Sequence, residues 1–137
     1  MIMFLFYIKN ISFAIGLKSI VFTKNLVKIS KYPGLRPPLL TFYFYDEKVI
    51  PIYNLGYFFN ENSLEFKDLI FIGNEEKTIA LVADDMDVAD NYEYVKCDDV
   101  SNLSFIEKNK LLVFNGRKHL IIDENKLLNA KELHIKG

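Results

Sequence analysis

The sequence predicts a mainly β protein made of two small units with a similar plan, because two patterns each occur twice. An apolar run followed by a more polar turn occupies residues 12–20 and again 78–86. A basic residue, an apolar run and an Asn or Asp occupy residues 48–55 and again 117–124. The copies lie 66 and 69 residues apart, about half of the 137-residue chain. Two such units side by side form a groove, which is typical of a binding module more than of an enzyme.

The composition favours strands around a packed core. The chain holds 12 Phe and 8 Tyr but no Trp, and 50% of its residues are hydrophobic. Aromatic side chains suit a pleated, half-buried surface, and this apolar content excludes a disordered chain. A length of 137 residues fits one compact domain. The single cysteine, Cys97, excludes an internal disulfide and favours a reducing compartment.

The charge and hydropathy patterns argue against nucleic acid and membrane as partners. The formal net charge is −1, whereas a nucleic-acid-binding surface is basic. No apolar run approaches the ~18 residues that a membrane-spanning helix needs. The N-terminus is apolar but lacks the basic region and the small-residue cleavage site of a signal peptide. We therefore expect a cytoplasmic protein that binds neither nucleic acid nor membrane.

The elements of the first half are expected to be strands joined by turns. Asn10 starts the turn between the first two strands. Residues 32–38 hold three prolines and a glycine, which exclude regular structure and make this the main loop. Pro51 lies inside a strand, so one edge of that strand is unpaired or bulged. Residues 54–59 form a short helix or turn. The expected strands are residues 3–9, 13–17, 20–29, 39–45 and 49–53.

The second half repeats this plan and ends in a helix. Its clearest hairpin joins residues 111–114 to 118–122 through Asn115 and Gly116, a pair that suits a type I′ turn. Residues 124–133 are the best helix candidate. Asp123 is the expected N-cap, because its carboxylate can accept a hydrogen bond from an unpaired backbone N–H. The other expected strands are residues 66–72, 77–83, 92–95 and 103–106.

Several stretches, taken in order, resemble the CheW-like domain, the coupling module of bacterial chemotaxis. The longest covers residues 115–128 and is similar to the family's Asp-Gly-Arg, strand, Asp, helix pattern. Residues 78–86 look like the family's second-half strand, and residues 48–55 are similar to its Pro-containing strand. Phe13-Ala14-Ile15 with Ile20 matches its opening hairpin. The similarity covers nearly the whole chain.

The resemblance implies two small five-stranded SH3-like β-barrel subdomains packed on a shared core, with a short C-terminal helix. Residues 1–137 would form one CheW-like domain, with subdomains at about 13–62 and 66–123 and termini that cross over. The family performs no catalysis and needs no cofactor. Such an adaptor bridges the cytoplasmic tip of a chemoreceptor and the regulatory domain of the histidine kinase CheA, which has the same fold.

One departure from the family pattern bears on the receptor partner. The family usually has Arg-Gly before its Pro-containing strand, and that arginine is tied to signalling contacts. Here Asp46 and Glu47 stand at these positions, so two anions replace a cation. A partner carboxylate bound there would be repelled. Asn54 also replaces an Asp, and Ala80 replaces a Gly. These changes fit a divergent paralogue with a different receptor or kinase partner.

The family docks its partners on the first barrel, so the resemblance places the contact residues on, or just beyond, the strands of that barrel. Tyrosine is enriched at protein interfaces, which supports the tyrosines among them. Unpaired barrel edges and exposed aromatic side chains also allow homo-oligomers. The candidate contact residues are Ile20, Phe22, Tyr43, Tyr45, Asp46, Tyr53 and Asn54.

The aromatic run at residues 42–45 has a second functional interpretation. Side chains alternate across a strand, so Phe42 and Phe44 share one face and Tyr43 and Tyr45 the other. Together with Lys48, the run resembles a platform on which the bases of a single strand stack. The acidic surroundings favour instead one core face and one half-exposed face. A β-barrel that binds nucleic acid or a small ligand is therefore the alternative function.

No residue pattern predicts catalysis or a metal site. Cys97 has no nearby histidine, and neither His119 nor His134 has a second ligand at metal spacing. We expect both histidines to be structural or surface residues. A run of aspartates could attract a hard cation, but it lacks the glycine and the closing glutamate of an EF-hand loop. A solvated loop or an acidic docking patch is expected there. The aspartates are Asp84, Asp85, Asp87 and Asp90.

Overall fold

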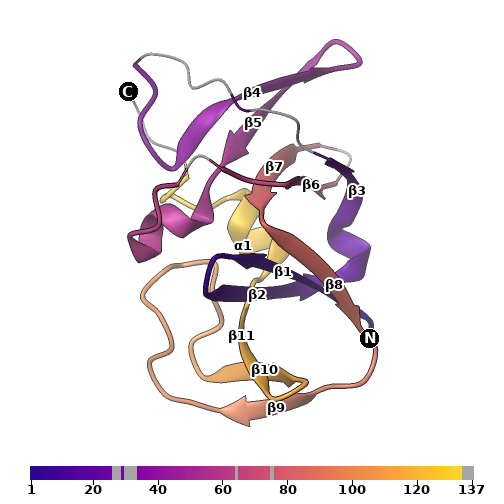
Figure 1. The fold of residues 1–137 in the computed structure, drawn as a ribbon, viewed down its shortest axis with the longest axis vertical. Coiled ribbons are helices and arrows are strands. Elements are labelled where there is room, and N and C mark those ends of the chain that lie inside the picture. Colours follow the sequence, from indigo (N-terminus) through magenta and orange to yellow (C-terminus); the bar gives the residue numbers. More distant parts are fainter. Residues whose placement is uncertain (26–28, 30–33, 64, 75, 134–137) are drawn as a thin grey trace.

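Two β-sheets and one short α-helix form the described part of the protein (Figure 1). The structure is a computed structural model, which describes residues 1–137 apart from 26–28, 30–33, 64, 75 and 134–137. The six-stranded sheet has the order β8-β1-β2-β11-β10-β9, and the five-stranded sheet has the order β3-β6-β7-β5-β4.

Each sheet draws its strands from separate parts of the chain. The six-stranded sheet holds β1 (Met3–Ile8), β2 (Ile11–Gly16), β8 (Asp85–Ala89), β9 (Glu93–Lys96), β10 (Lys110–Phe114) and β11 (Arg117–Ile121). The five-stranded sheet holds β3 (Ile20–Asn25), β4 (Leu39–Tyr45), β5 (Lys48–Tyr53), β6 (Asp68–Gly73) and β7 (Thr78–Ala83). The helical elements are η1 (Leu17–Ser19), η2 (Leu55–Phe59) and α1 (Glu124–Leu128).

The predicted mainly β fold of two units with a short C-terminal helix is confirmed. Two details differ from the expected pair of five-stranded barrels. One sheet has six strands, and the strand order of each sheet is open among the described residues, because its two edge strands do not pair. The additional strand is β9, which pairs with the outer side of β10.

The internal repeat of the sequence corresponds to a repeated strand pairing. In the five-stranded sheet β5 runs parallel to β7, with Ile52 opposite Ala80. In the six-stranded sheet β11 runs parallel to β2, with Ile121 opposite Ala14. These two pairs are related by the same offsets of 69 and 66 residues. The order β3-β6-β7-β5-β4 therefore matches β8-β1-β2-β11-β10 strand by strand, and β9 has no counterpart among the described residues.

The two halves of the chain exchange strands, because the chain crosses from one sheet to the other after β2 and again after β7. β3 follows β2 along the chain but pairs with β6, whereas β8 follows β7 but pairs with β1. Figure 1 shows β8 continuing from β7 and running beside β1. This exchange joins the two sheets through the backbone as well as through side chains.

A shared hydrophobic core lies between the sheets. Alternate residues of β1 point to opposite faces, so Phe6 joins the main core while Leu5 joins a smaller cluster on the other face of the six-stranded sheet. Phe71 of the five-stranded sheet and Leu127 of α1 belong to the same main core as Phe6. The core predicted to be shared by both units is therefore present.

The C-terminal helix is shorter than the predicted 124–133. The N-cap prediction is confirmed, because Asp123 accepts a hydrogen bond from the Lys126 N–H at 3.0 Å. The helix ends at Leu128, and Asn129 donates from Nδ2 to the Asn125 carbonyl at 2.9 Å. The same carbonyl also accepts the Asn129 backbone N–H at 3.2 Å, so Asn129 closes the helix with both its side chain and its backbone. No helix in the described residues is long and apolar enough to cross a membrane.

The prediction of a solvated loop over the acidic run is wrong for residues 85–89, which form β8. The N–H groups of Met86 and Val88 donate to the carboxylates of Asp85 and Asp87, at 2.9 and 2.8 Å. The aspartates thereby satisfy backbone donors of an edge strand that no neighbouring strand covers among the described residues.

Other element predictions need smaller corrections. Residues 103–106 are not a strand, because only Ile106 forms an isolated bridge, with Ile122. β3 ends at Asn25, before the end of the predicted strand at residue 29. The rest of that prediction falls partly on residues 26–28, which lie outside the described residues, as do His134 and part of the proline-rich loop. Residues 55–59 form the 3₁₀ helix η2, within the short helix expected there.

Candidate functional site

Three predicted contact residues meet where the five-stranded sheet curls. Phe22 on β3 stacks on Phe71 of β6, with ring centroids 4.1 Å apart. The Tyr45 ring of β4 lies 5.5 Å from Phe22, and the Tyr43 ring lies 5.1 Å from Phe71. We call these four residues the aromatic cluster. The cluster connects β3 with β4, the two edge strands of this sheet. These strands share no backbone pairing among the described residues, so they are linked here by side chains only.

Lys24 adds a cation to the aromatic cluster. Its Nζ donates to the Tyr43 hydroxyl at 2.9 Å and lies 5.3 Å from the centroid of the same ring. Lys24 was absent from the predicted contact residues, because only the curl of the sheet brings β3 near β4, and strand alternation carries no information on that curl.

The hairpin of β4 and β5 exposes its tip and its outer face. Asp46 and Glu47 have φ values of 48° and 64°, which form a type I′ turn. Both turn residues are exposed. On the outer face Phe44 pairs with Val49, and their side chains are 69% and 57% exposed. Figure 1 shows this hairpin extending from one end of the molecule. Phe44 was not predicted as a contact residue, because alternation alone does not say which face is core.

Tyr53 and Asn54 are buried at the other end of β5. The Asn54 Oδ1 accepts from the Gly56 N–H at 2.9 Å, and Nδ2 donates to the Glu61 carbonyl at 3.0 Å. Burial raises the pKa of the Tyr53 hydroxyl above its ordinary value. The Asn54 side chain thus ties η2 to the end of β5, while Tyr53 belongs to the main core, so the surface near the hairpin is formed by other residues.

The seven predicted contact residues therefore divide by exposure. Tyr45 and Asp46 are exposed, the side chains of Ile20, Phe22 and Tyr43 are half-buried, and Tyr53 and Asn54 are buried. Their role in partner binding stays a prediction.

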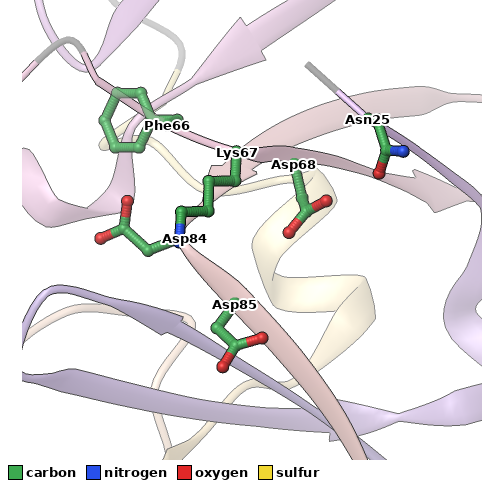
Figure 2. A pocket seen from close by; sticks show the side chains of 6 residues that line it. All are labelled: Asn25, Phe66, Lys67, Asp68, Asp84 and Asp85. Atoms are coloured by element: carbon green, nitrogen blue, oxygen red, sulfur yellow. The ribbon is translucent and has the colours of Figure 1, made fainter. Parts of the chain in front are cut away.

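A separate depression of about 630 Å³ lies where β3, the start of β6 and the junction of β7 with β8 meet (Figure 2). Asp68, Asp84 and Asp85 line it, with Lys67 as the accompanying cation. Burial raises the pKa of the Asp68 carboxyl, and the charge of Asp85 raises it further. The depression therefore contains Asp84 and Asp85 of the acidic run, and a docking role for that run stays a prediction.

The acidic depression is not arranged as a metal centre. Asp84 is engaged by Lys9, whose backbone N–H donates to Oδ2 at 2.7 Å and whose Nζ lies 3.8 Å from the same oxygen. Within the described ranges, no group of three His, Cys, Asp or Glu side chains is placed to hold a metal ion. The arrangement suits electrostatic attraction of a basic surface more than chelation.

His119 is fully buried on β11, where its ring contacts the Tyr7 hydroxyl and the backbone of Arg117 and Leu112. Nδ1 lies 3.0 Å from the Arg117 carbonyl, which only accepts, so Nδ1 carries the proton. Nε2 then accepts from the Tyr7 hydroxyl at 3.2 Å. Burial lowers the pKa of the imidazole, and the charge of Arg117 adds to this, against two backbone hydrogen bonds and Asp87. Both ring nitrogens are thus engaged in hydrogen bonds within the six-stranded sheet.

The pair of exchanged sheets with a terminal helix is a CheW-like fold. The crystal structure of the scaffolding protein TtCheW from Thermoanaerobacter tengcongensis matches this chain with a TM-score of 0.73. The match covers 98% of this chain and 96% of that chain, at 14% sequence identity. No family model matches the chain, and no curated protein is significantly similar in sequence. The resemblance found in the sequence is therefore confirmed for the fold.

Proposed function

We propose that this protein is a non-catalytic cytoplasmic adaptor of a chemotaxis system, which couples chemoreceptors to a CheA-type histidine kinase through protein–protein contacts. The observation that carries the proposal is the match of nearly the whole chain to a solved scaffolding protein. The sequence resemblance supplies the partners, because the CheW-like domain binds the kinase regulatory domain and the receptor tip.

The contact surface that we propose is the exposed end of the β4–β5 hairpin together with Phe22, Tyr43 and Tyr45 of the aromatic cluster, of which the first two pack on the buried Phe71. Tyr45 is 51% exposed and its ring is supported by Phe22. A large, rigid ring that is held from below and open above is typical of an interface anchor. Phe44 and Val49 extend the apolar area on the opposite face of the same hairpin.

The receptor side of the proposal is shaped by the hairpin turn. Asp46 and Glu47 occupy the two central positions of the turn, where the resemblance expects Arg-Gly. Both residues are exposed at the tip of the hairpin. We therefore propose that the receptor segment bound by this protein is more basic than the usual one, since acidic groups on it would be repelled.

Titration calorimetry with the regulatory domain of a CheA kinase from the same organism tests the proposal. We expect one-to-one binding in the micromolar range or tighter, and Tyr45→Ala should weaken it by about tenfold or more because it removes an anchor. Val88→Ala is the matched control, since Val88 is similarly exposed but lies on β8 of the other sheet.

The failures of this experiment are distinguishable. No binding at tens of micromolar would contradict the adaptor function while leaving the fold unaffected. Unchanged affinity of the Tyr45 variant would remove that residue from the contact surface. Salt-dependent binding of a single-stranded oligonucleotide would instead support the alternative of a nucleic-acid-binding barrel, because phosphate contacts release counterions.

A further inference from the structure

The edge strands of the two sheets are protected to different degrees. A strand edge presents unpaired backbone groups, and proteins blunt it with charges, bulges or short strands. Among the described residues β3, β8 and β9 are blunted in this way. β3 carries Lys24 and a bulge between Ile20 and Phe22, β8 carries two aspartates that bond its own N–H groups, and β9 has four residues, including Glu93 and Lys96.

β4 lacks these protections over most of its length. Its seven residues make it the longest strand of the described structure, and Leu-Leu-Thr-Phe-Tyr-Phe-Tyr contains no charge, proline or glycine. Its register with β5 shifts only near Leu39, so residues 41–45 are regular. An uncharged, regular, aromatic edge strand is the type that pairs with another strand.

The register of the hairpin shows which backbone groups are free. Tyr45 and Lys48 flank the two-residue turn and therefore form a hydrogen-bonded pair. Bonded and unbonded pairs alternate in an antiparallel ladder, so Phe42 and Phe44 direct their N–H and C=O groups to the outer edge. Pro51 agrees with this assignment, because it stands opposite Phe42 and has no N–H to donate.

The equivalent edge of the other sheet shows how such an edge is paired. β10 is the counterpart of β4, and its outer edge pairs with the antiparallel strand β9. The bond from the Cys97 N–H to the Asn109 carbonyl places Leu111 and Val113 at the bonded positions of that ladder. Leu111 and Val113 correspond to Phe42 and Phe44. The same edge of the five-stranded sheet has no strand upon it among the described residues.

We propose that the β4 edge pairs with β4 of a second copy of this chain, antiparallel and about a two-fold axis at Tyr43. This register places Phe42 opposite Phe44 of the second copy and uses all four outward backbone groups of both residues. The paired residues of the two strands carry no charge, and the nearest charge on each copy is Lys24, which is hydrogen-bonded to Tyr43. Self-pairing of β8 would instead bring the aspartates of the paired strands near each other. Facing aromatic residues are favourable cross-strand pairs.

The available area predicts a weak dimer. A fully exposed aromatic side chain offers roughly 200 Å², so the exposed parts of Phe44, Val49, Tyr45 and the strand edge supply roughly 400 Å² on each copy. The total of roughly 800 Å² is below the roughly 1,200 Å² at which stable specific interfaces begin, and it fits only a weak, transient contact. The dimer is therefore expected to form at micromolar concentrations and to exchange rapidly.

Sedimentation velocity of the full chain alone, from about 1 to about 500 μM, tests the proposal without any kinase or receptor. We expect a concentration-dependent shift from monomer to dimer. Phe44→Lys should raise the dissociation constant by about tenfold or more, because it places like charges near each other across the edge. Val88→Lys is the control, since it adds the same charge to an exposed position of another edge strand. Circular dichroism checks that both variants fold.

Amide hydrogen exchange at low and high protein concentration identifies the paired edge. The amides of Phe42 and Phe44 should exchange more slowly in the dimer, while those of Tyr43 and Tyr45, already bonded to β5, should not change. A monomer throughout the range would overturn the proposal, as would a dimer that survives Phe44→Lys or leaves the Phe42 and Phe44 amides unprotected. Protection that appears only when another protein is added would show that the edge accepts a foreign strand instead.

Discussion

The hairpins β4–β5 and β10–β11 occupy equivalent positions in the two sheets, yet one is open and the other is covered. Both turn through two residues with positive φ, Asp46-Glu47 in the first and Asn115-Gly116 in the second. β9 covers the outer edge of the second hairpin, and no described strand covers the first. The same hairpin arrangement is therefore covered at its outer edge in the six-stranded sheet and accessible in the five-stranded sheet.

The buried faces of the two hairpins also differ in chemistry. Ile50 on β5 corresponds to His119 on β11, and both side chains are buried. The isoleucine packs into the main core, whereas the histidine is held by hydrogen bonds to Arg117 and Tyr7. The first hairpin thus depends on apolar packing and the second on a polar network. Mutations at Ile50 and His119 can measure the two contributions separately.

The largest expected effect comes from the core of the first hairpin. Ile50→Ala should lower the free energy of unfolding by about 2–5 kcal/mol, because it removes buried methyl groups and leaves a cavity. Urea denaturation followed by circular dichroism measures this loss. Val49→Ala, at the exposed neighbouring position, should change stability by no more than about 0.5 kcal/mol. A loss below 1 kcal/mol for the Ile50 variant would show that β5 is not anchored as described.

The second hairpin should respond to pH. The pKa of His119 is lowered in the folded protein, so the unfolded chain binds the proton more tightly, at its ordinary pKa of about 6.5. Stability should therefore be constant above this pH and fall as the pH drops below it, by at most about 1.4 kcal/mol per pH unit.

Urea titrations at pH 7.5, 6.5 and 5.5 measure this dependence. His119→Gln should flatten it, because the amide keeps a partner for Tyr7 but does not titrate in this range. Equal slopes in the wild type and the variant would contradict the assignment of the pH dependence to His119.

The smallest expected effect comes from the turns. Glu47 adopts φ 64° with a side chain that disfavours it, so Glu47→Gly should stabilise the protein by about 1 kcal/mol. Position 116 already holds a glycine at a positive φ of 75°, so Gly116→Ala should destabilise the protein by a similar amount. Thermal denaturation measures both. A Glu47→Gly variant no more stable than the wild type would show that this turn is compensated elsewhere.

Much of the fold was predictable because local signals agreed with the final structure. The Asn-Gly turn, the Asp123 cap and the repeated apolar runs each report short-range preferences, and each corresponds to an observed element. β8 was not predicted, because its acidic residues accept hydrogen bonds from the strand's own N–H groups, which a sequence pattern does not show. Aspartate is depleted in strands, so composition pointed to a loop.

The candidate site was less predictable than the fold. Alternation correctly separated Tyr43 and Tyr45 from Phe42 and Phe44, but it could not say that Phe44 faces outward. The burial of Asn54 follows from its hydrogen bonds to η2 and to the residues after it, which fold back over the end of β5. Both features depend on contacts between residues distant in space or in loops, which a period-two pattern does not record.

The exchange of β3 and β8 between the sheets has a consequence for how the chain reaches its native state. β1, with the apolar sequence Met-Phe-Leu-Phe-Tyr-Ile, has Phe4 paired with Val88, so its partner is synthesised long after it. Pairings of such large sequence separation form slowly. During translation, β1 therefore keeps one edge unpaired until β8 has been synthesised. Because both sheets contain strands from both halves of the chain, neither half can form a complete sheet alone. Co-expressed halves cut near residue 62 should accordingly be insoluble separately and recover structure only together.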